Sequence, residues 1–338
     1  MKRLLNTLYV MREDSYLRLD GENVVVQQDG EVAARFPLHT LNSIVCFSYA
    51  GASPQLMGAC VEKNIDLSFF TPRGFYLASA TGESRGNVLL RKRQYRLSDD
   101  ASASCLIARN MLLGKVYNSR AVLERALRDH PQRVDIPKLR TASATLANTL
   151  PFIENETDLE TLRGLEGKAA LCYFGVLDEL ILQGREVFAF SGRSRRPPRD
   201  PVNAMLSFAY ALLARDCASA LSAVGLDPYV GFLHRDRPGR ASLALDLMEE
   251  QRSVRADRFV LTLINNRVMQ PKHFITKENE SCLLDDEGRR TFLKAWQERK
   301  QDTMTHPFLG EQIPWGLLPH VQALLLARTL RGDYDAYP

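Results

Sequence analysis

A change of pattern near residue 85 limits the fold more than any other feature of the sequence. Before it, short runs rich in Val, Leu and Phe alternate with turn signals such as DGEN (20–23) and QDGE (28–31), which is typical of β-hairpins. After it, turn signals become rare and apolar residues recur at helical spacing. The sequence therefore predicts an α+β fold, in which a small N-terminal β domain (1–85) precedes a larger α-helical domain (86–338).

Individual elements follow from local signals. In the first part we expect a helix beginning at Ser53-Pro54, because serine caps helices and proline suits their first position. We also expect a hairpin around Pro72-Arg73-Gly74 and strands over LNTLYV (5–10) and LNSIVCFS (41–48). The final residues, GDYDAYP (332–338), are expected to fray. Helices are predicted over 116–129, 158–183, 201–225, 242–268 and 314–332.

The composition excludes several classes of protein. Hydrophobic content of 45% and charged content of 25% suit a globular chain, and we see no uninterrupted apolar run of the ~20 residues that cross a bilayer. The N-terminus has no small-residue cleavage site. The six cysteines form no C-x-x-C pair, which suits reduced thiols. We therefore expect a cytoplasmic protein with no membrane partner.

One predicted helix carries acids where a surface helix would carry a mixture of charges. In SLALDLMEEQ (242–251), Asp246, Glu249 and Glu250 fall within about 100° of arc, and leucine, alanine and methionine fill most of the rest. The helix is therefore predicted to be buried, with its acids facing one site. Clustered buried carboxylates repel one another unless a cation or a proton intervenes.

A second acid stands out at Glu166. It interrupts the apolar stripe of TLRGLEGKAALCYF (161–174) at a core position. Gly164 and Gly167 flank it, each at a cost of roughly 1 kcal/mol within a helix, which suggests that another group approaches this backbone closely. Glu166 is either a site residue or a buried acid paired with an arginine.

His234 lies on a Pro/Gly-rich turn just before the acid-bearing helix. One imidazole with two or three carboxylates is a ligand set suited to Mn²⁺ or Mg²⁺, and zinc fits less well because no cysteine joins. Taken alone, a histidine on a loop is more often a surface or satisfied core residue than a ligand. The surrounding Arg235, Arg237 and Arg240 favour a phosphate-bearing substrate. The residues thus indicate metal-dependent phosphodiester chemistry.

Two further basic segments are candidate contacts to DNA phosphates, or else solvated basic loops. The sequence contains no phosphate-binding loop of the G-x-x-x-x-G-K-[ST] type and no H-E-x-x-H. The basic residues are Arg193, Arg195, Arg196 and Arg199 in SGRSRRPPRDP, and Arg91, Lys92, Arg93 and Arg96 in LLRKRQYR.

Three segments in this order resemble the CRISPR adaptation integrase, the endonuclease subunit that inserts new spacers into CRISPR arrays. They are LRGLEGKAALCYF, RRPPRDPVNAMLSFAYALL and LDPYVGFLHRDRPGRASLALDLMEEQR. The opening LLNTLYV…SYLRLDGENVVV is most similar to the type I-C branch.

The resemblance implies a metal site formed by Glu166, His234 and Glu249, with Asp246 beside the metal. Many members of the family carry aspartate at the position of Glu249, which changes reach but not charge. The resemblance also implies a homodimer formed through the β domain, and two dimers bracketing a dimer of a small companion subunit in a heterohexamer. It leaves open whether a processing exonuclease joins this complex.

The reaction implied is attack by the 3′-hydroxyl of a prespacer on a phosphodiester of leader–repeat DNA, with the basic segments holding the DNA backbone. Two other classes stay open. A hydrolytic metal nuclease would use the same residues with water as nucleophile, and a strand-transfer assay separates it. A non-catalytic DNA-binding scaffold would pair its acids with arginines, and metal titration separates that.

Overall fold

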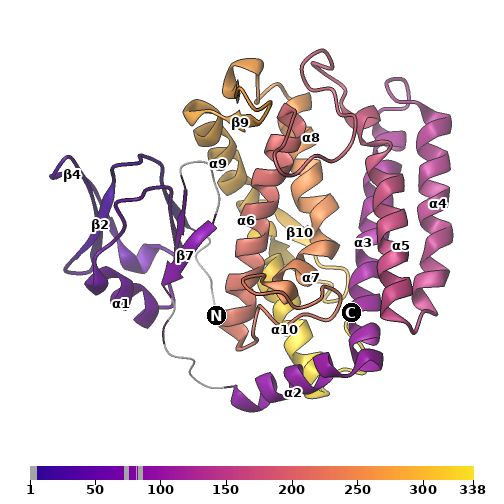
Figure 1. The fold of residues 1–338 in the computed structure, drawn as a ribbon, viewed down its shortest axis with the longest axis horizontal. Coiled ribbons are helices and arrows are strands. Elements are labelled where there is room, and N and C mark those ends of the chain that lie inside the picture. The colour runs from indigo at the N-terminus through magenta and orange to yellow at the C-terminus, as the bar shows by residue number, and fades with distance from the viewer. Residues whose placement is uncertain (1–5, 72–75, 81, 83–86) are drawn as a thin grey trace. The chain divides into compact units, whose positions relative to one another are not determined.

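The computed structural model of the protein describes residues 6–71, 76–80, 82 and 87–338. The chain divides into two compact units. Unit 1 is Met1–Arg85 with Leu284–Leu318, and unit 2 is Gly86–Leu283 with Pro319–Pro338. Strands dominate the N-terminal region and helices the rest (Figure 1), so the predicted α+β class is confirmed. The predicted domain limits, 1–85 and 86–338, stay predictions, because a compact unit need not fold or act alone.

The N-terminal part of unit 1 contains two sheets. One has the strand order β1-β5-β6-β7, in which β1 and β6 run parallel to β5 and β7 runs antiparallel to β6. The other is the antiparallel sheet β2-β3-β4. The elements are β1 (Thr7–Val10), β2 (Tyr16–Asp20), β3 (Asn23–Gln28), β4 (Glu31–Pro37), η1 (Leu38–Thr40), β5 (Ser43–Cys46), α1 (Pro54–Glu62), β6 (Asp66–Phe70) and β7 (Tyr76–Ala80).

Several local predictions for this region are confirmed. Asp29 and Gly30 both have positive φ, 51° and 84°, as a two-residue hairpin turn between β3 and β4 requires. Helix α1 begins where expected, because the Ser53 side chain accepts a hydrogen bond from the Leu56 N–H. Strands β6 and β7 pair as predicted, while the turn around Pro72-Arg73-Gly74 lies outside the described residues.

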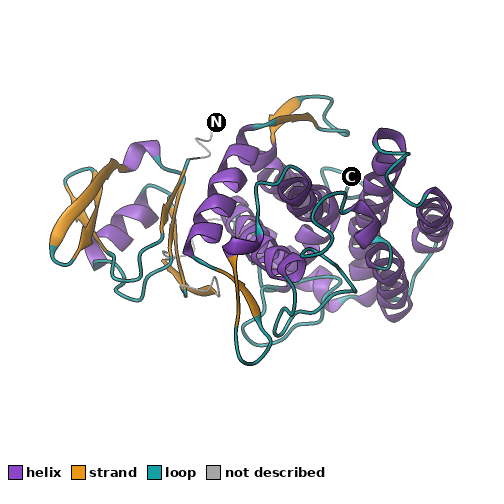
Figure 2. Cartoon of the chain, turned by 90° about the horizontal axis from the view of Figure 1, so that it is seen from above, coloured by secondary structure: helices purple, strands orange, loops and turns teal. Residues whose placement is uncertain are grey.

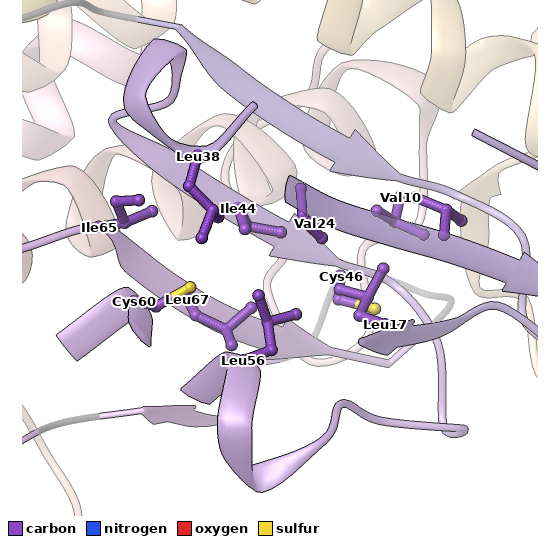
Figure 3. Packing of buried hydrophobic residues seen from close by; sticks show 11 residues of the cluster. Val10, Leu17, Val24, Leu38, Ile44, Cys46, Leu56, Cys60, Ile65 and Leu67 are labelled. Atoms are coloured by element: carbon purple, nitrogen blue, oxygen red, sulfur yellow. The ribbon is translucent and has the colours of Figure 1, made fainter. Parts of the chain in front are cut away.

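One hydrophobic cluster holds these sheets and α1 together (Figure 3). Leu17, Val24, Ile44, Leu56 and Leu67 are fully buried in it. They come from both sheets and from α1, and each buried aliphatic side chain contributes about 1.5–3 kcal/mol to folding. The apolar residues of the short runs seen in the sequence therefore pack into one core that both sheets and α1 share.

The later segment of unit 1 is mixed in structure. Its helix α9 begins after Asp285, whose side chain accepts a hydrogen bond from the Gly288 N–H. Strands β10 and β11 form an antiparallel pair. The elements are α9 (Asp286–Gln301), β10 (Thr303–Thr305), β11 (Gln312–Pro314) and η5 (Trp315–Leu317).

Unit 2 is mostly helical (Figure 2). Its longest helix, α3, packs against α2, α4, α5 and α7, so side chains from several segments meet on it. The elements are α2 (Val88–Asp99), α3 (Ala101–Asp129), α4 (Ile136–Glu154), α5 (Leu159–Phe174), η2 (Leu177–Leu180), α6 (Pro201–Val224), α7 (Ser242–Gln251), η3 (Arg252–Asp257), α8 (Arg258–Asn265), η4 (Pro271–His273), β8 (Phe274–Thr276), β9 (Cys282–Leu284) and α10 (Leu318–Arg331).

Two predicted helices are interrupted. The helix expected over 158–183 ends at Phe174, with Gly175 at its C-cap and the short 3₁₀ turn η2 after it. The helix expected over 242–268 contains a π-helical segment, η3, between α7 and α8. π-Helical turns are rare and frequently occur at functional sites.

Helix α6 matches its prediction closely. Asp200 caps it by accepting a hydrogen bond from the Asn203 N–H, and Gly225 ends it at a positive φ of 87°. It is the one helix of the described residues with the length and apolar composition to cross a membrane. Since 56% of that apolar window is buried inside the protein, α6 has the character of a core helix.

The expectation that the C-terminus frays is wrong. The Tyr337 side chain is 3% exposed, its hydroxyl donates to Glu250 Oε1 at 2.6 Å, and Gln322 Nε2 donates to that hydroxyl at 2.8 Å. Its carbonyl oxygen accepts a hydrogen bond from Asn110 at 2.7 Å. The tail is therefore fixed to α3, α7 and α10.

Candidate metal centre

Two of the predicted ligands meet at a buried lysine that the sequence did not single out. Lys115 of α3 forms ion pairs with Glu166 of α5 and Glu249 of α7, and its Nζ lies 2.6 Å from Glu249 Oε2. Only 8% of the Lys115 side chain and 3% of the Glu249 side chain are exposed. The structure thus brings Glu166 and Glu249 together around one cation.

Glu249 has a second cationic partner, because Arg252 lies one turn further along and its NH2 is 2.6 Å from Glu249 Oε1. Burial alone would raise the pKa of Glu249, but the charges of Arg252 and Lys115 outweigh burial and lower the pKa to about 2. Glu249 is therefore a carboxylate at neutral pH, the form that binds metal ions.

His234 is held by Asp246. The ring Nδ1 and the backbone N–H of His234 donate to Asp246 Oδ1, at 2.6 and 3.0 Å. Asp246 Oδ2 accepts the backbone N–H groups of Phe232 and Leu233 at 2.6 and 2.9 Å. Because a carboxylate can only accept hydrogen bonds, the Nδ1–H of His234 faces Asp246, and Nε2 is the ring nitrogen turned away from it. Histidines that bind metals are commonly oriented by a carboxylate in this way.

The His234 turn lies very close to α7, and the sequence allows this through Gly231. A Cβ atom at Gly231 would lie 2.8 Å from Asp246 Oδ2, so only glycine fits there. Other elements fix the same turn. Arg163 of α5 donates to the Leu233 carbonyl at 2.7 Å, and Gln94 of α2 donates to the Val230 carbonyl at 2.9 Å. The turn is thereby tied to the helix that carries Glu166.

The prediction that all three acids of α7 face one site is wrong. Asp246 binds the His234 turn and Glu249 faces Lys115, whereas Glu250 accepts hydrogen bonds from Tyr337 and Gln322. Burial raises the pKa of Glu250 to about 7. A helical arc of 100° is wide enough for neighbouring side chains to reach different partners.

The expectation that a group approaches Gly164 and Gly167 closely is also wrong for the described residues. A Cβ atom added to either glycine would meet no other atom within 4 Å. Both glycines lie on the exposed side of α5. Glu166 itself is partly accessible, because 29% of its side chain is exposed.

The π-helical segment η3 packs next to the candidate metal centre through its first and last residues. It begins with Arg252, whose guanidinium lies 4.8 Å from the ring centroid of Tyr210, and ends with Asp257, which accepts a hydrogen bond from the Tyr210 hydroxyl. Burial raises the pKa of Asp257 to about 6. The segment thus carries Arg252, which contacts Glu249, and Asp257, which contacts Tyr210.

The arginines predicted to contact DNA are placed differently from one another. Arg193 turns inward, donates to the Asn203 side chain and lies 5.1 Å from the Tyr210 ring centroid. Arg235 is largely exposed and pairs with Glu160 at 2.7 Å. Arg240 is half-buried and donates to Ser242. The other predicted arginines are exposed, except for the half-buried Arg91: Arg93, Arg96, Arg195, Arg196, Arg199 and Arg237.

The chemistry of these residues fits a divalent cation. Among the described residues, no three His, Cys, Asp or Glu side chains are arranged to hold a metal ion as they stand. The place between Glu166 and Glu249 is taken by the Lys115 ammonium. Glu249 Oε2 is buried, and the Lys115 Nζ lies 2.6 Å from it. An accessible imidazole nitrogen and two carboxylates already joined by a cation form a suitable donor set.

Sequence reasoning missed Lys115 and Arg252. A signal for Lys115 was present, because Lys115 lies on the buried stripe of α3 with Ala108, Met111 and Leu112, at spacings of three and four residues. A lysine on an apolar stripe indicates a buried partner, as Glu166 did on α5. Arg252 stands three residues after Glu249, the spacing at which opposite charges pair on a helix, so a signal for it was present as well.

Comparison with known proteins identifies a family. The family described as CRISPR associated protein Cas1 matches residues 8–298. The chain is 47% identical over 338 residues to CRISPR-associated endonuclease Cas1 1 of Chlorobaculum tepidum and 51% identical over 344 residues to CRISPR-associated endonuclease Cas1 2 of Rhodospirillum rubrum. Both alignments cover 100% of this chain and 98% of the relative. A Cas4 exonuclease/Cas1 endonuclease fusion of Geobacter sulfurreducens is 34% identical, over 98% of this chain and 59% of the fusion.

Solved structures share the fold. A casposase bound to integration product has a TM-score of 0.84 at 24% identity, covering 97% of this chain and 91% of that one. A Cas1 protein from Thermotoga maritima has a TM-score of 0.83 at 22% identity, covering 98% and 99%. A Cas6-RT-Cas1–Cas2 complex has a TM-score of 0.80 at 21% identity, covering 98% of this chain and 35% of that one. These likenesses concern the fold alone.

Proposed function

The chain belongs to the Cas1 family of CRISPR-associated endonucleases, and on that premise we propose that it is a divalent-metal-dependent DNA endonuclease and integrase that inserts new spacers into a CRISPR array. One observation carries the proposal at the level of residues. Glu166 and Glu249 converge from two helices on a single buried cation, and the neighbouring turn presents a histidine oriented by Asp246.

Mn²⁺ or Mg²⁺ is the proposed cofactor, held by Glu166, His234 and Glu249. When bound, such an ion polarises a phosphodiester and stabilises charge on the leaving oxygen. The chain keeps Glu249 ionised and holds the Nδ1 side of the His234 ring against Asp246, so that Nε2 is the nitrogen turned toward a ligand. Asp246 acts through His234 as a positioning residue.

The proposed reaction is a transesterification. The 3′-hydroxyl oxygen of prespacer DNA attacks the phosphorus of a leader–repeat phosphodiester and forms a new P–O bond. The attacking hydroxyl loses its proton, the bond to the leaving 3′-oxygen breaks, and that oxygen takes up a proton. One phosphodiester is broken and one is formed, so no external energy source is needed. Holding the two DNA strands in line makes the attack effectively unimolecular.

DNA is proposed to bind along arginines near the centre. Arg195, Arg196 and Arg199 follow one another before α6, and Arg235 and Arg237 follow His234. Arg193 is committed to Asn203 and Tyr210, so its proposed part is to shape the segment rather than to contact phosphate. Contacts from the other arginines would be largely independent of sequence and sensitive to salt.

The proposed assembly is a homodimer formed through residues 1–85, with two dimers bracketing a dimer of a small companion subunit. The Cas6-RT-Cas1–Cas2 complex among the proteins of similar fold is consistent with such a companion. The Cas4/Cas1 fusion from Geobacter sulfurreducens likewise supports a processing exonuclease as a partner. We also propose that the chain belongs to the type I-C branch and acts in the cytoplasm, where its six free cysteines would stay reduced.

The metal centre is tested by Mn²⁺-dependent cleavage of DNA. Glu166→Gln, His234→Ala and Glu249→Gln should each reduce cleavage at least a hundredfold while circular dichroism shows the fold retained. Glu179→Gln is the matched control, because Glu179 also pairs with a lysine, Lys138 at 2.7 Å, but belongs to η2 outside the centre. Full activity in Glu166→Gln would refute the ligand assignment.

The nucleophile is tested by strand transfer. With the companion subunit, Mn²⁺ or Mg²⁺ and a leader–repeat duplex, the protein should join prespacer 3′-hydroxyl ends to repeat DNA. Ends blocked with dideoxynucleotides should abolish the joined product and leave DNA binding intact. If only hydrolysed fragments form with unblocked ends, the proposed integrase activity is refuted and a hydrolytic nuclease is the function that remains.

A further inference from the structure

We propose that Lys115 is a built-in cation that holds Glu166 and Glu249 together until a divalent ion takes its place, and that it thereby limits how tightly the centre binds metal. The inference rests on the proposed metal centre and adds a residue to it. In this role Lys115 is a positioning residue, since it acts through the two glutamates.

The position of Lys115 is unusual for a lysine. It lies on the buried stripe of α3 beside Met111, Leu112 and Val116, where an unpaired ammonium would be strongly disfavoured. Its charge is tolerated because it contacts two carboxylates at once, those of Glu166 and Glu249. In turn, the ammonium compensates two acids that would otherwise repel each other.

The contacts of Lys115 are the contacts that a metal ion would need. Its Nζ pairs with Glu166 Oε1 and Glu249 Oε2, and Glu249 Oε2 is a buried oxygen. An ammonium and a divalent ion cannot both lie against these oxygens, because they exclude and repel each other. Metal binding therefore has to move Nζ, and the flexible lysine side chain allows this.

When Lys115 is displaced, Glu249 still has a cationic partner. Glu249 keeps Arg252, whose NH2 pairs with its other oxygen, Oε1, at 2.6 Å. Each cation thus contacts a different oxygen of Glu249. Arg252 contacts Oε1, and Lys115 contacts Oε2, the oxygen proposed to bind the metal. Only the Lys115 contact competes with a metal ion.

A different role for Lys115 would give different results. A lysine that only stabilises the fold would leave metal affinity unchanged when replaced. A lysine that helps to hold the metal, by fixing the glutamates in ligating positions, would weaken metal binding when replaced. The proposal requires the opposite, since removing the ammonium removes a competitor and restores repulsion between Glu166 and Glu249.

The experiment is a Mn²⁺ titration of the full chain without DNA, in which electron paramagnetic resonance reports free Mn²⁺. Lys115→Gln should bind Mn²⁺ about tenfold more tightly than the wild type, or more. Lys115→Arg, which keeps the charge, should bind no more tightly than the wild type. Lys138→Gln removes a lysine that pairs with Glu179 on the surface and should leave Mn²⁺ affinity unchanged.

Thermal unfolding gives a second readout. Without metal, Lys115→Gln should unfold at a lower temperature than the wild type, and saturating Mn²⁺ should raise its Tm by more than it raises that of the wild type. If Lys115→Gln does not fold, Lys115→Met, with a flexible apolar side chain of similar length, takes its place in both measurements.

The outcomes separate this inference from the proposed function. If Glu166→Gln weakens Mn²⁺ binding but Lys115→Gln leaves it unchanged or weaker, the role of Lys115 is refuted and the metal centre stands. Tighter binding by Lys115→Arg than by the wild type would refute the role as well. If neither Glu166→Gln nor Glu249→Gln alters Mn²⁺ binding, the ligand assignment fails, and the proposed function fails with it.

Discussion

Replacing Tyr337 with phenylalanine removes one oxygen from the C-terminal tail and tests whether that tail stabilises the unit that carries the metal centre. The hydroxyl is buried, donates to Glu250 Oε1 at 2.6 Å and accepts a hydrogen bond from Gln322 Nε2 at 2.8 Å. Glu250 follows Glu249 directly on α7. The tail therefore binds the residue next to a proposed ligand.

The expected loss of stability follows from the contacts that remain after Tyr337 is replaced by phenylalanine. The phenylalanine ring fills the space of the tyrosine ring, so no cavity term arises. Removing the partner of a buried polar group costs about 1–3 kcal/mol. Glu250 Oε1 keeps Gln322 at 2.9 Å, so the acid is not left wholly unpaired. We expect the free energy of unfolding to fall by about 2 kcal/mol.

The assay is urea unfolding of Tyr337→Phe and of a matched variant, Tyr334→Phe, in the same tail. Tyr334 accepts a hydrogen bond from Arg328 at 2.9 Å, in an exposed place, so its replacement should change stability by less than about 0.5 kcal/mol. Equal decreases in the two variants, or a decrease below about 0.5 kcal/mol for Tyr337→Phe, would refute the reasoning and restore the view of a frayed tail.

Three further predictions concern the surroundings of the centre. Burial raises the pKa of Asp257 from 3.8 to about 6, so the stability contributed by its protonated form is present below pH ~4 and disappears as pH rises through about 6. Between pH 5 and 7, urea unfolding should show the stability of the wild type falling by about 1 kcal/mol more than that of Asp257→Asn. Equal decreases in the two proteins would contradict this. Asp246→Asn should weaken Mn²⁺ binding about 10–100-fold, because an amide does not fix the His234 proton on Nδ1, and unchanged affinity in the resonance titration would show that Asp246 does not orient the ligand. Neutralising Arg195 and Arg196 should make the slope of log K against log salt for duplex DNA shallower by about 0.9 for each phosphate that these arginines neutralise, whereas an unchanged slope would make them solvated residues.

The sequence predicted the parts of the fold that depend on local rules. Turn residues placed the β3–β4 hairpin at Asp29 and Gly30, and a serine followed by proline placed the start of α1. Helix α6 was predicted almost to the residue, and in the structure Asp200 and Gly225 cap its ends. Such signals act within a few residues and need no knowledge of the rest of the chain.

What the sequence did not predict depends on contacts between distant segments. Glu250 was assigned to the acid cluster because helical geometry gives an angle but not a partner, and its partner is Tyr337, 87 residues away. The π-helical segment that begins at Arg252 has no pattern of its own in the sequence. Lys115 was visible only as an exception on an apolar stripe. Each of these is decided by tertiary packing.

Helix α7 shows how packing gives neighbouring acids different chemistry. Glu249 and Glu250 are adjacent and both are buried, and burial pushes the pKa of each upward. At Glu249 two cationic side chains, Arg252 and Lys115, outweigh burial and bring the pKa to about 2. At Glu250 the hydrogen bonds from Tyr337 and Gln322 are neutral and only partly offset burial, so the pKa stays at about 7. A metal ligand must be ionised to bind its metal, and a buried structural contact need not be. The cations therefore decide which acid of α7 can serve as a ligand, and the one that touches both Glu249 and Glu166 is the one that a metal would replace.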